Sequence, residues 1–269
     1  MRIAQIVLPN ASEYERKSQR VDHAALAEKH EVLVVPIEDV ADVRADIAHV
    51  YAGGELPSAP FVGFPGSYLS SAALRPSRWS WRKPVAPSLI VSPLGGEPVP
   101  EAVEDRYFSE SVARDSAVKI IGSFDRPSVR NSVEQTMARI HRFRDDVEWQ
   151  MHREPPSPTE LSEVDLWVDP AVDENDFDGF VAEALVVGLP IVATRTPINV
   201  LRLEKGRTGF LTPPRDPNEM THAILTALFK TEVAQARQIA ARQTVSKFRA
   251  RPRLRILTRM YEQLITTTR

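Results

Sequence analysis

The sequence predicts an α/β protein made of two Rossmann-like domains, both reduced in size compared with typical domains of that kind. Apolar runs of strand length alternate with longer amphipathic stretches along most of the 269 residues, and this alternation is typical of parallel α/β sheets. The alternation fails between Leu74 and Pro100, where prolines mix with basic and aromatic residues, and a second series begins near "AVKIIGS". We therefore predict two domains, at residues 1–110 and 111–269.

The N-terminal series begins with the apolar run "RIAQIVLP", whose length and final proline favour a buried strand. A helix within "RVDHAALAEKH" then leads through a turn at Lys29-His30 into a second strand, "EVLVV". A strand-then-glycine pattern recurs twice, and one more strand is expected inside the irregular segment; these stretches are "ADIAHVYAGG", "APFVGFPGS" and "SLIVSP".

The C-terminal series opens with the strand "AVKIIGS" and a helix for which Ser128 or Asn131 is a suitable N-cap. One further helix ends in a glycine and another is capped by Asp216 before a proline. Two helical stretches interrupted by Pro252 close the chain, the last at about residues 253–267. The remaining predicted elements are the strands "VEWQM", "VDLWVDP", "LPIVAT" and the edge strand "GRTGFLTPP", and the helices "GFVAEALVVG" and "DPNEMTHAILTALFK".

The composition excludes several classes of protein. Without cysteine, the chain has no disulfide, thiolate zinc site or cysteine nucleophile. A formal charge of −2 supplies no general attraction to nucleic acid. No stretch approaches the roughly 20 apolar residues of a membrane span, and the N-terminus lacks the apolar core of a signal peptide. We expect a cytoplasmic protein.

An acidic stretch, "DENDFDGFVAE", follows one of the predicted strands. Like charges this close repel one another, so they require a cation, a ligand rich in hydroxyl groups, or simple solvation. The stretch lies at the carboxyl end of a parallel strand, where ligands of open α/β sheets bind. Carboxylates there can accept hydrogen bonds from sugar hydroxyls. The acidic residues are Asp173, Glu174, Asp176, Asp178 and Glu183.

The acidic stretch has two other interpretations. A calcium loop that started at Glu174 would use Asp176, Asp178 and Gly179, but its twelfth residue would be Leu185 rather than glutamate. Acidic residues near the start of a helix are also favoured by the helix dipole alone, without any ligand. The calcium loop is disfavoured, whereas simple solvation and a ligand with hydroxyl groups both remain open from these residues alone.

The order of residues from about Leu161 to Ile224 resembles the donor-binding half of the retaining "group 1" glycosyltransferases of GT-B fold. That fold implies two domains facing a cleft, with the last helix crossing back to the N-terminal, acceptor-side domain. The matching pieces are Pro170, Glu174, Phe177, Glu183-Ala184, Gly188-Leu189-Pro190, Ala193-Thr194, Gly206 to Phe210, Pro213-Pro214 and Asp216.

The resemblance assigns roles to individual residues. It implies that Glu174 holds the transferred sugar, that Glu183 holds the ribose of the nucleotide, and that the backbone around Phe177, Asp178 and Gly179 faces the donor. Ser123 stands at the phosphate-loop position where the family has arginine, which leaves Arg126 and Arg130 to neutralise the departing diphosphate. The donor is then a nucleoside diphosphate sugar, with neither a metal nor another cofactor required.

This sequence also departs from the family pattern. Eight residues separate Glu174 from Glu183, one more than usual, so the usual spacing would select Asn175. The glycine-rich acceptor loop is replaced by "PNASEYERKSQR", and no histidine occurs between His49 and His141. One strand-helix unit before "PTELSE" is missing. A non-catalytic relative that binds a protein partner is therefore the alternative hypothesis, and a sugar-nucleotide epimerase is a third.

Two basic segments carry further hypotheses. "LRPSRWSWRKP" interleaves tryptophan with arginine, which suits stacking on a sugar or weak contact with an anionic membrane surface. We prefer an ordinary loop whose tryptophans pack on the core. "KFRARPRLRILTR" suits phosphate binding by its charge, but its apolar residues suit one buried helix face, which we prefer. His49 and His141 are expected to be structural or exposed. The apolar residues of the second segment are Phe248, Leu254, Ile256 and Leu257.

Overall fold

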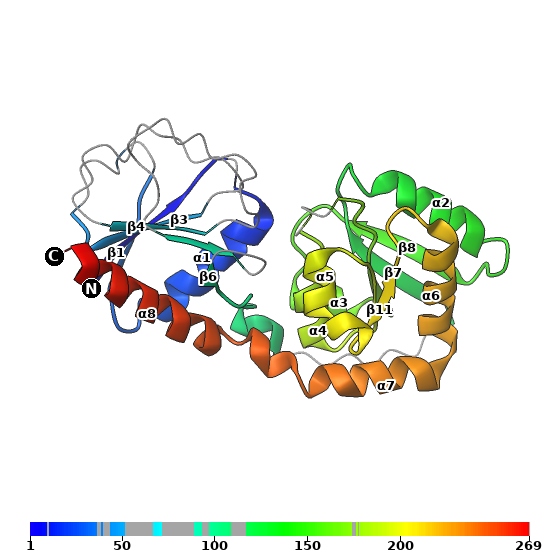
Figure 1. Cartoon of the computed structure of the whole chain (residues 1–269). Helices are drawn as coiled ribbons and strands as arrows, with labels where there is room; N and C mark the ends of the chain where they lie inside the picture. Colours follow the sequence, from blue (N-terminus) through cyan, green and yellow to red (C-terminus); the bar gives the residue numbers. More distant parts are fainter. Residues whose placement is uncertain are drawn as a thin grey trace. The chain divides into compact units, whose positions relative to one another are not determined.

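The chain forms two compact units, each with its own parallel sheet (Figure 1). One unit comprises Met1–Glu104 together with Lys247–Arg269, and the other comprises Asp105–Ser246. The boundary predicted between residues 110 and 111 lies outside the described residues. The computed structural model describes residues 1–9, 11–36, 39, 44–51, 67–71, 89–92, 97–108, 117–173, 176 and 178–268.

The sheet of the first unit has six parallel strands in the order β2-β1-β3-β4-β5-β6. The predicted strands near the N-terminus and at "EVLVV", "ADIAHVYAGG" and "SLIVSP" are present, whereas most of "APFVGFPGS" lies outside the described residues. The strand bounds are β1 Arg2–Val7, β2 Glu31–Val34, β3 Ile47–Tyr51, β4 Ser67–Ser71, β5 Leu89–Ser92 and β6 Glu97–Pro98.

Helix α1 (Glu13–Leu26) begins well before the sequence suggested, within the segment interpreted as a replaced acceptor loop. Ser12 caps it, and the Glu15 side chain accepts a hydrogen bond of 2.9 Å from the Ser12 backbone N–H. Because this reciprocal pair satisfies free N–H groups of the first turn, it fixes the start of the helix. Most of "PNASEYERKSQR", the segment that replaces the family's acceptor loop, is therefore helical.

The last helix, α8 (Ala250–Thr268), starts earlier than the predicted residue 253, and Pro252 does not interrupt it. Pro252 lies in the first turn, where a helix leaves its N–H groups without partners and so tolerates proline. The helix packs on α1 and on the N-terminal sheet. Its apolar residues are the buried face that we preferred: Phe248, just before it, and Leu257 are buried, and Leu254 and Ile256 are partly buried.

One arginine of the basic segment, Arg253, is neutralised inside this unit. Arg253 is buried, and its guanidinium donates to both carboxylate oxygens of Asp22 at 2.6 and 2.8 Å. Asp22 also accepts from the Tyr51 hydroxyl at 2.8 Å, and the Tyr261 hydroxyl lies 2.6 Å from His49 Nδ1. These contacts join α1, β3 and α8 in one buried polar network, and His49 is structural, as expected.

Acidification is expected to weaken this unit through His49. Burial, and then the positive charge of Arg253, lowers the pKa of His49 well below its ordinary value of 6.5. The folded chain therefore keeps the ring neutral while the unfolded chain takes up a proton below pH 6.5, so stability falls as pH falls. Between pH 7 and 5 the loss is at most about 2 kcal/mol.

Chemical denaturation of the wild type and of His49→Asn at pH 7, 6 and 5 measures this effect. The variant should lack this part of the pH dependence, whereas His222→Asn, at an exposed position, should retain it. Equal slopes in the wild type and His49→Asn would contradict the assignment.

The sheet of the second unit has five parallel strands in the order β11-β10-β9-β7-β8, with helices on both faces (Figure 1). Helix α6 packs against α2 over one apolar core. The strands are β7 Lys119–Phe124, β8 Val147–His152, β9 Leu166–Asp169, β10 Ile191–Thr194 and β11 Phe210–Thr212. The helices are α2 Arg130–Ile140, α3 Pro158–Ser162, α4 Val181–Val187, α5 Pro197–Arg202, α6 Pro217–Phe229 and α7 Thr231–Arg242.

Local capping explains the differences from the predicted elements here. The N-cap of α2 is Val129, not Ser128 or Asn131, and no side chain caps that helix. The short helices α3 and α5, which were not predicted, each start with a proline after a capping Ser157 or Thr196. Asp216 caps α6 as predicted, accepting from two backbone N–H groups.

Candidate functional site

The C-terminal ends of three adjacent strands bring polar residues together in the second unit. Asp125 and Arg126 follow β7, Asp169 is the last residue of β9, and Thr194 is the last residue of β10. Since these strands are neighbours and parallel, their ends meet at one edge of the sheet. This edge is where open α/β sheets bind ligands. We call the group of Arg126, Asp169, Asp176 and Asn199 the edge cluster.

Arg126 is the central cation of the edge cluster. Only 9% of the residue is exposed, and its guanidinium bonds to Asp169 through Nη2 and to Asp176 through Nη1. Burial lowers the pKa of Arg126, but the carboxylates of Asp169 and Asp176 raise it, and the net shift is upward. The guanidinium therefore stays charged although it is buried.

Asp169 is held rigidly behind Arg126. Its side chain is fully buried, and its Oδ2 accepts a hydrogen bond of 2.7 Å from Asn199 Nδ2. Asn199 also donates to the Thr194 carbonyl at 3.2 Å, which ties the pair to β10. A Cβ at Gly179 would lie 2.4 Å from the Asp169 Cγ atom, so only glycine leaves room for this carboxylate.

The negative charge of Asp176, in the acidic stretch, is balanced by a cation of the chain. Besides its ion pair with Arg126, it accepts from Ser128 Oγ at 3.3 Å and from the Asp178 backbone N–H at 3.4 Å. Burial raises the pKa of Asp176, and the nearby charge of Arg126 opposes that shift. The crowded carboxylates could be explained by a cation, by a ligand rich in hydroxyl groups or by solvation. For Asp176 the explanation is a cation, and that cation is Arg126.

Arg130, predicted to act on the diphosphate, binds a carboxylate near the same edge. Its Nε and Nη2 donate to Asp125 at 2.8 and 2.9 Å, and its side chain is 56% exposed. The hydrogen bonds from Arg130 lower the pKa of Asp125. Both arginines that the sequence offered for phosphate binding thus contact aspartates.

The other predicted site residues lie in different surroundings. Ser123, inside β7, is buried and accepts a hydrogen bond of 2.7 Å from Trp149 Nε1. Asp178 is half-buried, and the Gly179 carbonyl accepts from Trp167 Nε1 at 2.7 Å. Glu183 is buried in the first turn of α4. Glu174 and Phe177 lie outside the described residues.

Sequence reasoning missed Asp169 and Asn199. Both had a detectable signal, since Asp169 ends a strand before a proline and Asn199 stands three residues after a capping threonine. Their pairing depends on the packing of β9 against β10, which sequence periodicity does not show.

The charges of this site do not balance. Three aspartates, Asp125, Asp169 and Asp176, contact the two arginines. A diphosphate that bound here would therefore have to displace a carboxylate or bring its own cation.

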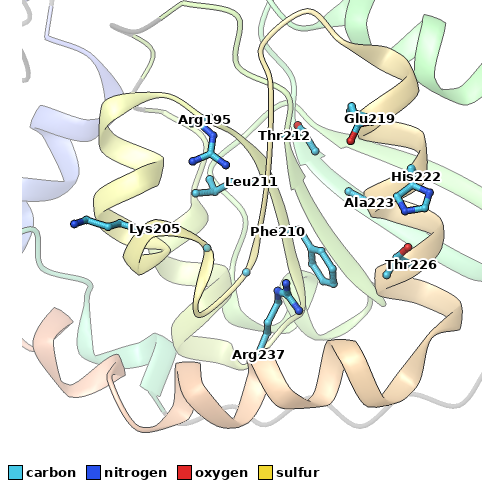
Figure 2. A pocket seen from close by; sticks show the side chains of 12 residues that line it. Arg195, Lys205, Phe210, Leu211, Thr212, Glu219, His222, Ala223, Thr226 and Arg237 are labelled. Carbon is cyan, nitrogen blue, oxygen red and sulfur yellow. The ribbon is translucent and has the colours of Figure 1, made fainter.

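Apart from the edge cluster, this unit contains a hollow of about 350 Å³ along the edge strand β11 (Figure 2). Arg195 and Arg237 lie at its two ends, and the Lys205 side chain points away from it (Figure 2). Arg237 lies over the Phe210 ring, 4.1 Å from its centroid. The hollow contains none of the predicted site residues, and its cations do not converge on one point, so we place the candidate site at the edge cluster.

Neither a membrane-spanning helix nor a metal-binding cluster occurs among the described residues. No helix among them has the length and hydropathy needed to cross a lipid bilayer. No group of three or more histidine, aspartate and glutamate side chains there is arranged to hold a metal ion. The segment "LRPSRWSWRKP", for which membrane contact was one hypothesis, lies outside the described residues.

Comparisons with known proteins agree with this architecture. Residues 101–229 match the family model described as "Glycosyl transferases group 1". No curated protein matches the chain by sequence.

Several solved structures share the fold over nearly the whole chain. HepE of Anabaena, solved with UDP and glucose, is 13% identical with a TM-score of 0.73, and the match covers 97% of this chain and 99% of that one. A glycosyltransferase of Rickettsia africae is 13% identical, covers 98% of both chains and has a TM-score of 0.68. Sucrose-phosphate synthase of Thermosynechococcus elongatus is 11% identical, covers 99% and 100%, and has a TM-score of 0.70.

The family match lies on the unit that contains the edge cluster, and the fold match extends over both units. Residues 101–229 match the group 1 glycosyltransferase model, and the chain has the GT-B fold of the glycosyltransferases that it resembles, in a shortened and divergent form.

Proposed function

We propose that the chain transfers a sugar from a nucleoside diphosphate sugar to an acceptor, with Arg126 as the anchor for the diphosphate. The observation that carries this proposal is a permanently charged arginine, buried at the ligand-binding edge of the sheet and positioned from behind by Asp169 and Asn199. A fixed cation of this kind stabilises a departing diphosphate in the transition state. HepE, which shares the fold, was solved with UDP and with UDP-glucose, and this supports the class of donor.

The remaining roles belong to the same proposal. Glu183 binds the ribose hydroxyls, Glu174 binds the transferred sugar, and the reaction retains the configuration of the sugar, as in the family that the chain resembles. Since Arg126 supplies positive charge, the reaction proceeds without a metal. Arg130 contributes if it exchanges Asp125 for a phosphate.

A non-catalytic binding subunit is the second candidate, and one observation favours it. Both arginines that could neutralise a diphosphate are bound to aspartates. A relative that had lost catalysis would retain such ion pairs for folding alone and would use its surface for a protein partner.

Calorimetry with UDP, GDP, ADP and their sugars separates the two candidates. We expect one nucleotide series to bind below millimolar concentration, and Glu183→Gln to weaken that binding about tenfold because one charged hydrogen-bond acceptor is lost. Glu219→Gln, at an exposed position of α6, should bind as the wild type does. A thermal melt of each variant verifies folding.

If no nucleotide bound at millimolar concentration, the transferase proposal would be rejected in favour of the binding subunit. Product analysis by NMR then tests retention for whichever donor binds: retention predicts that the anomeric configuration of donor and product is the same.

A further inference from the structure

The two aspartates that bind Arg126 differ in their burial and in their other hydrogen bonds. Asp169 belongs to a strand, is fully buried and receives a hydrogen bond of 2.7 Å from Asn199. Asp176 lies in the segment between β9 and α4, where its side chain is 10% exposed and its other bonds measure 3.3 and 3.4 Å. Asp169 is therefore a fixed partner of the guanidinium, whereas Asp176 is its less buried and more weakly held partner.

We propose that Asp176 competes with the donor's phosphates for Nη1 of Arg126, and so sets the affinity of the site for diphosphates. This inference rests on the proposed function. Asp169 and Asn199 are positioning residues, which keep the guanidinium in place while its partner on the Nη1 side changes.

The chemistry of the guanidinium supports such an exchange. Its N–H groups donate equally well to carboxylate and to phosphate oxygens, so a phosphate oxygen can take the place of the Asp176 oxygen on Nη1. One positive charge cannot balance Asp169, Asp176 and a diphosphate together, so binding is favoured when one carboxylate withdraws. Asp169 cannot withdraw, because its side chain is fully buried and bonded to Asn199.

Asp176 loses little stabilisation when it leaves Arg126. Its burial already disfavours the charged carboxylate and raises its pKa, as do the neighbouring charges of Asp169 and Asp178. Asp176 can regain water as it turns outward, because its side chain is not fully buried.

Asp176→Asn tests the proposal, because the amide keeps an oxygen acceptor of similar shape while removing the competing charge. Calorimetry on the full chain would use UDP with uridine, GDP with guanosine, and ADP with adenosine. We expect Asp176→Asn to bind the diphosphate that the wild type prefers about tenfold more tightly. Its affinity for the matching nucleoside should be unchanged, because a nucleoside has no phosphate. Asp173→Asn, an exposed carboxylate of the same segment, is the matched control.

The outcomes distinguish this inference from the proposed function. Equal or weaker diphosphate binding by Asp176→Asn overturns the competition but leaves the donor proposal intact. An equal gain for the nucleoside also overturns it, since a loosened segment rather than a removed charge would then be the cause. If neither protein bound any nucleotide, the proposed function and this inference would both be rejected. Asp169→Asn should weaken diphosphate binding without a comparable effect on the nucleoside.

Discussion

Replacing Arg253 by leucine is expected to lower the free energy of unfolding by about 3–5 kcal/mol. The substitution leaves the Asp22 carboxylate buried without the two hydrogen bonds that now neutralise it. The network that joins α1, β3 and α8 would thus keep a negative charge with no cation beside it. Urea denaturation, followed by circular dichroism, measures the loss.

A matched control is available on the same helix. Arg255→Leu removes an exposed arginine of α8 and should change the stability by no more than about 0.5 kcal/mol. In the double variant Asp22→Leu with Arg253→Leu, the buried charge is absent, so the loss should be smaller than the sum of the single losses. Additive losses would show that packing, rather than the ion pair, explains the effect.

Replacing Arg126 by leucine is expected to remove nucleotide binding and to destabilise the second unit as well. Two carboxylates, Asp169 and Asp176, would lose their cation, and truncation of one partner of a buried charged pair costs about 3–5 kcal/mol. The diphosphate would at the same time lose its anchor. Thermal melts report the first effect, and calorimetry with the preferred nucleotide reports the second.

Arg126→Lys separates charge from geometry. Lysine keeps the positive charge but cannot span two oxygen acceptors with a planar fork. We expect it to recover part of the stability and little of the nucleotide affinity. Arg130→Lys, which changes an exposed arginine bonded to Asp125, should be nearly neutral for stability. Full nucleotide affinity in Arg126→Leu would refute the anchor role.

Much of the fold could be predicted because each element carries its own local signal. The parallel strands of the second unit are short apolar runs, and the start of α6 is marked by Asp216 and Pro217. The errors were also local. The capping pair of Ser12 and Glu15 was not recognised, and Pro252 was interpreted as a break although the first turn of a helix accepts proline.

The candidate site was less predictable, because its contacts join distant segments. The family resemblance predicted Arg126 as a phosphate ligand, but the aspartates that it contacts stand 43 and 50 residues further along the chain. Periodicity identifies which residues reach the edge of a sheet. It does not show which carboxylate an arginine will bind there.

The discontinuous first unit has a consequence for the newly synthesised chain. Arg253 is translated 231 residues after Asp22, so Asp22 has no guanidinium partner while nearly all of the second unit, Asp105–Ser246, is being synthesised. Domains usually fold in order from the N-terminus during synthesis. Here the N-terminal sheet can close its buried polar network only after the C-terminal helix has emerged, which makes the first segment translated the last to be completed.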